Sequence, residues 1–228
     1  MIKHFVVGIL FLFCFFPLID DSFAKTDPPE LEKITFIDYS SPTHFGKQCD
    51  DGKITDNYSF FKSNIKWRTF PVSYSFDQST PQDQTRQEIS TAFNTWDDLY
   101  DNDFFVQNPS SRNVIQFSPI DGQGNVVAVT TMYYSPAEKK FTRFVVTFDS
   151  DEVWGIGTPE SIGFDGAGFF DLQDVAAHEV GHVVGLGHVN SPKDCMLTLF
   201  KYVEEGETIK RTLDQLSGDI LGFEDLYG

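Results

Sequence analysis

The segment that most constrains this chain is His178-Glu179-Val180-Gly181-His182-Val183-Val184-Gly185-Leu186-Gly187-His188. Helical residues four apart share one face, so His178 and His182 can present both imidazoles to one metal ion. Gly185 can take a positive φ and end the helix, which lets His188 return from the loop as a third ligand. Three protein ligands with an open fourth position are typical of catalytic zinc. We therefore expect one catalytic zinc ion, held by these three histidines.

Glu179 directly follows the first ligand and is the candidate general base. Zinc brings the pKa of a bound water toward neutrality, and Glu179 would take that proton while the water attacks a peptide carbonyl. The alternatives are histidines buried in a core and a non-catalytic metal clip. The chain has only 5 histidines, and a structural zinc site does not require the glutamate. The spacing therefore favours a hydrolytic zinc site.

The excess of acidic residues in this chain restricts the classes of partner that it can bind. The 228 residues carry 34 Asp and Glu against 17 Lys and Arg, a formal charge of −17. This charge argues against nucleic acid or an anionic membrane surface and suits hard cations such as calcium. With 40% hydrophobic residues, the chain has enough apolar surface for one compact domain and little room for two.

The first residues are typical of an export signal. Lys3 and His4 precede an apolar run from Phe5 to Ile19. Ser22-Phe23-Ala24 then has the small-x-small pattern of a signal-peptide cleavage site. A retained membrane anchor is the alternative, but it needs about 20 apolar residues. We expect residues 1–24 to be a signal peptide, the protein to be secreted, and no membrane association after its removal.

The rest of the chain divides into a polar stretch and a longer part whose apolar residues recur at helix and strand spacing. Residues 25–63 are turn-rich and predict an N-terminal extension or short prosegment, followed by a catalytic domain over residues 64–228. Strands are expected over 72–76, 114–117, 126–134 and 141–148. Three helices are expected: one starting at Thr80-Pro81, one capped by Asp171 and ending at Gly185, and one capped near Ser217. This order predicts an α+β fold with a mixed sheet.

Several segments resemble the catalytic domain of the matrixins, a family of metzincin zinc peptidases. Met196 follows His188 at the spacing of the family's Met-turn, an apolar floor beneath the metal. Phe148-Asp149-Ser150-Asp151-Glu152-Val153-Trp154 resembles the FDxDExW segment, and Leu216-Ser217-Gly218-Asp219-Ile220-Leu221-Gly222 resembles the closing helix. The resemblance spans roughly Ile65 to Gly228. It implies a five-stranded mixed sheet, three helices, and a cleft between the Met-turn and the edge strand Val126–Tyr134, which would bind extended peptide antiparallel.

The resemblance also implies a calcium site but no second zinc site. Family members hold calcium with acids of the FDxDExW segment, so Asp149, Asp151 and Glu152 are expected calcium ligands, with a solvated acidic turn as the alternative. A second, structural zinc is not expected, because the chain has no histidine between His44 and His178.

Other positions depart from the family pattern. Leu197-Thr198-Leu199 follows the Met-turn in place of the usual Tyr-Pro pair, so no cleavage preference is predicted. The PRCGxPD segment, whose cysteine blocks zinc in matrixin prosegments, is lacking around Cys49. A disulfide between Cys49 and Cys195 is expected, and capping of the zinc by Cys49 or a neighbouring Asp is the alternative. No accessory substrate-binding domain is expected after Gly228.

These observations predict a secreted, zinc-dependent metalloendopeptidase that hydrolyses extracellular proteins or peptides as a monomer. Two other classes remain open, namely a metal-binding or adhesive surface domain that cleaves poorly and a zinc hydrolase of small non-protein substrates. Glu179 favours the peptidase over the binding domain, because a binding domain has no use for a base beside an open metal position. The expected peptide-binding strand favours the peptidase over the small-molecule hydrolase.

Overall fold

The computed structural model describes residues 30–41, 54–62, 65–82, 84–156, 168–213 and 217–228. The expected signal peptide and Cys49 lie outside these ranges. Three helices are present, as predicted: α1 (Gln84–Asp97), α2 (Leu172–Val184) and α3 (Gly218–Tyr227). The strands are β1 (Glu32–Ser40), β2 (Ser59–Phe60), β3 (Val72–Phe76), β4 (Phe105–Gln107), β5 (Val114–Ser118), β6 (Val126–Ser135), β7 (Lys140–Asp149), β8 (Trp154–Gly155), β9 (Phe170–Asp171), β10 (Leu186–Gly187) and β11 (Tyr202–Val203). Two 3-10 turns, η3 (Pro192–Asp194) and η4 (Ile209–Arg211), complete the described elements.

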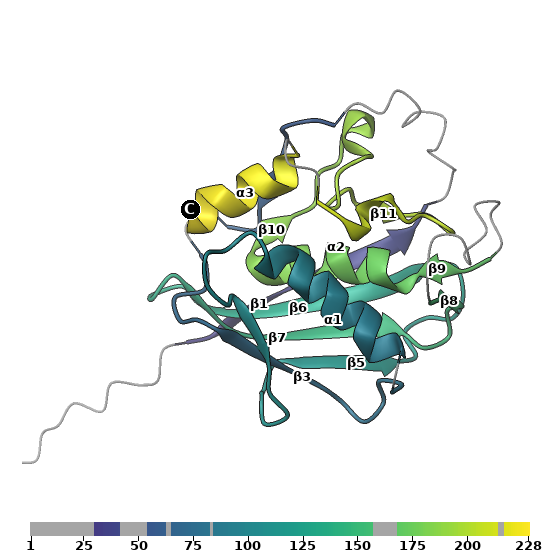
Figure 1. Cartoon of the computed structure of the whole chain (residues 1–228), viewed down its shortest axis with the longest axis horizontal. Helices are drawn as coiled ribbons and strands as arrows, with labels where there is room; N and C mark the ends of the chain where they lie inside the picture. Colours follow the sequence, from purple (N-terminus) through teal and green to yellow (C-terminus); the bar gives the residue numbers. More distant parts are fainter. Residues whose placement is uncertain (1–29, 42–53, 63–64, 83, 157–167, 214–216) are drawn as a thin grey trace, which may run out of the picture.

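The main sheet is mixed, as predicted, and has seven strands in the order β11-β1-β6-β7-β5-β3-β4. The five strands from β6 to β4 correspond to the expected five-stranded sheet. The prediction that Val126–Tyr134 is an edge strand is wrong for this structure, because β1 pairs antiparallel with β6 along its outer side (Figure 1). An edge strand leaves a row of unpaired backbone groups, and the N-terminal segment satisfies them here.

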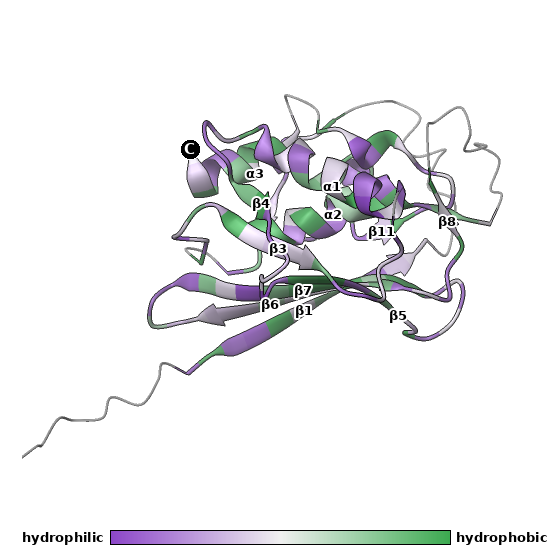
Figure 2. Cartoon of the chain, turned by 60° about the horizontal axis from the view of Figure 1, so that its bottom comes forward, coloured by the Kyte–Doolittle hydropathy of each residue, from purple (hydrophilic) through white to green (hydrophobic). Residues whose placement is uncertain are grey.

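The three helices lie on one side of the sheet (Figure 2). Helix α1 buries Ile89, Phe93 and Trp96 against the core. Trp96 donates its indole N–H to the carbonyl of Ala177 at 2.8 Å, which ties α1 to α2. Among the described residues no helix is long and apolar enough to cross a membrane.

The predicted start of the first helix at Thr80 is wrong. The helix begins at Gln84, and the buried hydroxyl of Thr80 donates to the carbonyl of Ile115 at 2.8 Å. Thr80 therefore fastens the preceding loop to β5 instead of capping the helix. The other two predicted caps are confirmed: Asp171 accepts from the Asp174 N–H at the start of α2, and Ser217 accepts from the Ile220 N–H at the start of α3.

Part of the expected N-terminal extension is packed onto the rest of the molecule. Besides β1 in the main sheet, β2 pairs antiparallel with β10. Between these strands, the carbonyl of Thr55 accepts from the Gly218 N–H at 2.9 Å. The side chains of Thr55 and Asn57 both donate to Asp194, at 2.7 and 2.8 Å. The segment before β3 is thus anchored both to the sheet and to the start of α3.

Candidate metal centre and catalytic residues

Helix α2 presents His178 and His182 from one face, one turn apart. Gly181 lies between them where α2 packs tightly. A Cβ at this position would lie 2.5 Å from Leu199 Cδ2 and 2.9 Å from Trp96 Cζ2. Only glycine therefore fits here without a shift of these neighbours, and the close packing fixes the helix that carries two of the three histidines.

Gly185 ends α2 as predicted, with φ 113°, a left-handed conformation that glycine tolerates. Its N–H closes the helix on the carbonyls of Gly181 and His182. The chain then forms β10, whose pairing with β2 directs it back toward the helix. His188 follows directly after β10 and joins the two helical histidines.

The three histidines converge through their Nε2 atoms. The Nε2 separations are 3.1 Å for His178–His182, 3.2 Å for His178–His188 and 3.0 Å for His182–His188. The sequence prediction that these residues form one site is confirmed. A fourth side chain, Asp38, belongs to the same group, and the ligand atoms of all four residues lie within 4.8 Å of one another.

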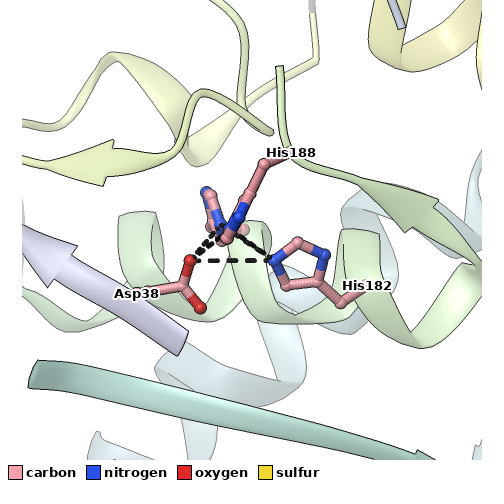
Figure 3. A group of neighbouring side chains, drawn as sticks. Asp38, His182 and His188 are labelled. Atoms are coloured by element: carbon pink, nitrogen blue, oxygen red, sulfur yellow. Dashed lines mark hydrogen bonds and ion pairs between the residues drawn. The ribbon is translucent and has the colours of Figure 1, made fainter. Parts of the chain in front are cut away.

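Asp38 comes from the N-terminal strand β1 and points into the histidine cluster (Figure 3). Its Oδ1 lies 2.7 Å from His178 Nε2, 2.6 Å from His188 Nε2 and 3.7 Å from His182 Nε2. Its side chain is 0% exposed. Burial alone would raise the pKa of Asp38, but the neighbouring histidines hold it well below the usual range. The carboxylate is therefore the ionised form.

The outer nitrogens of two histidines are held by backbone carbonyls. His178 Nδ1 lies 2.5 Å from the carbonyl oxygen of Thr198, and His182 Nδ1 lies 2.9 Å from that of Leu186. A carbonyl only accepts, so each Nδ1 carries the proton and each Nε2 presents a lone pair. Burial lowers the pKa of both rings, that of His182 to about 4, which keeps them neutral.

These four groups fit a metal ion. The three Nε2 atoms and a carboxylate oxygen converge on one point, where all four could coordinate a cation. Imidazoles and carboxylates are zinc ligands, and the backbone carbonyls that bind the Nδ1 atoms orient two of the rings as in known zinc sites. His178, His182 and His188 are the residues that would hold zinc, as the sequence predicted.

Glu179 is fully buried beside the cluster. The hydroxyl of Thr130, on β6, donates to its Oε2 at 2.5 Å. Its Oε1 has no donor among the described residues. Burial, followed by the negative charge of Asp38, raises the pKa of Glu179 well above its usual range. A carboxylate so placed is suited to proton transfer.

Sequence reasoning missed Asp38. A signal was available in the alternation along Glu32–Ser40, where Ile34, Phe36 and Asp38 face inward and the intervening residues are exposed. Such alternation is typical of a half-buried strand, and a carboxylate in its buried register is unusual. The general turn-rich character of residues 25–63 concealed this pattern.

The segment after the Met-turn is tied to both the histidines and α3. Asp219 accepts from the backbone N–H groups of Thr198 and Leu199 at 2.7 and 3.3 Å. The carbonyl of Thr198 in turn holds His178. Met196 is partly buried against a small apolar cluster of Val189, Cys195, Leu197 and Phe200. Its role as a floor beneath the metal stays a prediction.

Cys195 is disulfide-bonded. Cys49, its predicted partner, lies outside the described residues, so the pairing stays a prediction.

The predicted calcium ligands lie at the opposite end of β7 from the β6–β7 turn. Asp149 is buried and accepts from the N–H groups of Ile120, Asp121 and Asp151 at 3.2, 3.3 and 2.9 Å. Glu152 accepts from Gly124 N–H at 2.6 Å. Burial raises the pKa of Glu152, and the charges of Asp149 and Asp121 add to the rise. Asp121 thus joins this group, while the side chain of Asp151 is exposed.

Comparison with known proteins gives one family. The sequence model of the matrixin family (Peptidase_M10) matches residues 62–228. Human matrix metalloproteinase-16 is 29% identical over 182 residues, covering 72% of this chain and 27% of that protein. Karilysin from Tannerella forsythia is 31% identical over 192 residues, covering 78% and 37%. Metalloendoproteinase 1 from Glycine max is 29% identical over 196 residues, covering 80% and 59%. The chain thus spans less than two thirds of the length of each of these relatives.

Proposed function

Because the chain belongs to the matrixin family, and because its three histidines converge beside a buried glutamate, we propose that it is a zinc-dependent endopeptidase. The observation that carries the proposal is the convergence of the Nε2 atoms of His178, His182 and His188 within 3.2 Å of one another. Glu179 lies on the same helix as His178 and His182, directly after His178. The sequence predicted both features from spacing alone.

Each residue of the site has a distinct part in the proposed reaction. Bound zinc would supply a Lewis acid that polarises the scissile carbonyl and acidifies water. Glu179 would take the proton of the attacking water and pass it to the leaving amine. Thr130 holds one oxygen of Glu179 in place. The carbonyls of Thr198 and Leu186 hold two of the rings in the tautomer that ligates a metal.

The pairing of β6 supports a peptide substrate over a small molecule. β6 binds the extended strand β1 antiparallel, from Glu32 opposite Tyr134 to Tyr39 opposite Val126. Main-chain pairing of this kind recognises extended peptides independently of their side chains. A site that accepts a strand of this length beside its histidines is suited to internal bonds of an unfolded protein segment.

The test compares the purified full chain with Glu179→Ala, before and after limited proteolysis with trypsin. Zinc content and cleavage of casein are measured, with and without a zinc chelator. We expect one zinc per chain in both proteins, and a loss of about 10²-fold to 10⁴-fold in rate for Glu179→Ala. Glu224→Ala, at an exposed position of α3, is the matched control and should cleave like wild type. If the zinc-loaded wild type cleaves nothing in either form, a metal-binding domain becomes the better account.

We also propose that calcium binds near Asp149 and Glu152, with Asp151 as an outer contributor. Support comes from the family segment and from the buried carboxylates of Asp149 and Glu152, beside which the exposed Asp121 adds a third negative charge. Hard carboxylate oxygens suit calcium. If calcium binds here, adding it to the calcium-free protein raises the midpoint of thermal unfolding, and Glu152→Gln reduces that rise. An equal rise in both proteins would refute this site.

Secretion is the proposed localisation, with residues 1–24 as the signal peptide and the monomer as the working unit. The disulfide at Cys195 fits an oxidising compartment. N-terminal sequencing of the exported protein tests this, and a mature chain that still begins at Met1 would contradict it.

A further inference from the structure

We propose that β1 is an intramolecular inhibitor that fills the substrate cleft, with Asp38 as a fourth zinc ligand in the position that the reacting water needs. The inference rests on the proposed function, because it concerns regulation of the same site. It assigns a role to residues 30–41, which lie outside the part of the chain that the family model matches.

The position of β1 is that of an extended substrate. One side of β1 pairs antiparallel with β6, and the other pairs parallel with β11, where Tyr39 and Ser40 lie opposite Tyr202 and Val203. β11 follows the Met-turn segment in the chain. β1 therefore lies between the two walls of the expected cleft and runs in the direction expected of a peptide to be cleaved.

The inward face of β1 is fitted to the metal centre. The ring of Phe36 stacks on the imidazole of His182, with centroids 4.0 Å apart and planes 5° apart. Phe36 also makes an edge contact with Phe61, at 6.0 Å. Two residues further on, the next inward side chain is Asp38. The strand register thus delivers a carboxylate directly to the three Nε2 atoms.

The chemistry of Asp38 points to a metal ligand. A fully buried carboxylate is strongly destabilising unless a positive charge compensates it. The described contacts of its Oδ1 are the three ring nitrogens that would also hold the metal. Its Oδ2 has no hydrogen-bond partner among the described residues. A zinc ion held by the histidines would compensate the charge, and Asp38 would then complete four-fold coordination.

Both ends of β1 are fastened by side chains. Near its start, the carboxylate of Glu32 accepts from the hydroxyl of Tyr134 and lies 3.5 Å from Lys62 Nζ. At its end, the hydroxyl of Ser40 donates to the carbonyl of Gly124 at 2.7 Å. These contacts are partly exposed, so each contributes little alone. Together they hold a substrate-like strand whose own peptide bonds are protected, because Asp38 occupies the place of the nucleophile.

β1 is added to the side of a five-stranded sheet, to whose core it contributes Phe36. The strands from β6 to β4 make up the five-stranded sheet expected of the family, and β1 only adds to their outer side. The outward side chains of Ile37 and Tyr39 are 38% and 41% exposed. β1 is therefore an added strand at the cleft, which suits a segment that leaves when the enzyme is activated.

The first measurement is turnover of a fluorogenic peptide by the full chain, comparing wild type with Asp38→Ala and Asp38→Asn. Ile37→Ala, on the exposed side of the same strand, is the control. We expect Asp38→Ala to cleave at least about tenfold faster than wild type, equivalent to about 1.4 kcal/mol. Asp38→Asn keeps the shape of the side chain and should be activated to a smaller degree. Ile37→Ala should match wild type.

The second measurement does not depend on turnover. Each protein is loaded with cobalt(II) in place of zinc, and its visible spectrum is recorded with and without acetohydroxamate, a small metal-binding anion. We expect acetohydroxamate to change the spectrum of Asp38→Ala at concentrations that leave the spectra of wild type and Ile37→Ala unchanged. The spectra of wild type and Asp38→Ala should also differ before it is added.

The two measurements separate this inference from the proposed function. If wild type and Asp38→Ala respond equally to acetohydroxamate, the inhibitory role of Asp38 is refuted, even if both proteins cleave peptide. If the spectra differ as expected but no form of the protein cleaves, Asp38 stands as the metal cap and the endopeptidase proposal fails.

Discussion

The hydroxyl of Thr130, in the middle of β6, donates a hydrogen bond to Oε2 of Glu179, near the middle of α2. Both side chains are fully buried, and this bond joins the sheet to the candidate base. Because a base must hold its geometry to within a few tenths of an ångström, a residue that orients it contributes to rate without touching the substrate. Thr130 is therefore a positioning residue for Glu179.

Replacing Thr130 by Val is expected to lower kcat by about tenfold or more, as is typical when a hydrogen bond that orients a residue of a metal site is lost. KM and zinc content should stay close to the parent values, because neither the ligands nor the cleft walls change. The measurement is steady-state kinetics in the Asp38→Ala background, where no carboxylate caps the metal site. Thr130→Ser keeps the hydroxyl and should recover most of the rate. Equal losses in the Val and Ser variants would show that the methyl group, and not the hydrogen bond, matters.

Gly181 sets how closely α2 approaches its neighbours, and Gly181→Ala tests this. Alanine favours a helix by about 1 kcal/mol over glycine, but overpacking costs about 1–3 kcal/mol. We expect a net loss of about 1 kcal/mol in the free energy of unfolding, because the new Cβ would lie 2.5 Å from Leu199 and 2.9 Å from Trp96. Urea denaturation measures this loss. In a Leu199→Ala background, which removes the 2.5 Å contact and leaves the one with Trp96, Gly181→Ala should be less destabilising than in wild type; additive effects would argue against the contact with Leu199.

The parts of this molecule that sequence predicts best are those determined over a few residues. The caps Asp171 and Ser217 and the helix end at Gly185 depend on neighbours within one turn, and all three are confirmed. The spacing of His178, His182 and His188 likewise reflects one helix and one turn. Local chemistry was sufficient for these elements and for three of the four groups at the metal centre.

The predictions that failed depend on contacts between distant segments. Thr80 matches the pattern of a helix cap, but a hydrogen bond to Ile115 in a neighbouring strand uses its hydroxyl instead. Asp38 lies 150 residues from His188 in sequence, so no motif joins them. The outer side of β6 is likewise covered by a strand from the far end of the chain. Contacts of this kind depend on which segments become neighbours in the sheet and in which register. The composition and periodicity of a single segment do not predict either.

Asp174 gives a pH-dependent prediction away from the substrate cleft. Its Oδ1 accepts from the Lys210 N–H at 2.7 Å, and its Oδ2 has no partner among the described residues. Burial, followed by the charge of Glu207, raises its pKa well above the usual range. A carboxyl with a raised folded pKa takes up a proton on folding. The free energy of unfolding therefore falls as pH rises from the unfolded pKa, about 3.9, through the folded pKa, and stays low above it.

Asp174→Asn removes this titration and keeps the acceptor for Lys210. The variant is expected to be more stable than wild type at pH 8, by about 1–3 kcal/mol, the cost of an unpaired buried polar group. The difference should shrink as pH falls toward and below the unfolded pKa, about 3.9, because Asp174 becomes protonated in both states only there. Urea denaturation of both proteins at several pH values measures it. Asp98→Asn, at an exposed position, is the control; a pH-independent difference for Asp174→Asn would contradict the argument.

Removal of zinc should destabilise the fold, and Asp38 should contribute to the size of the effect. A metal that binds only the folded state at 1,000 times its Kd adds about 4 kcal/mol, which for a chain of this size is roughly 8–16 °C in Tm. Zinc removal by 1,10-phenanthroline, which leaves calcium in place, is expected to lower the Tm of the full chain by about this amount. In Asp38→Ala the decrease should be smaller, since three ligands bind more weakly than four and the zinc-free protein no longer buries an uncompensated carboxylate. Differential scanning calorimetry measures both decreases, and equal decreases in the two proteins would mean that Asp38 does not bind the metal.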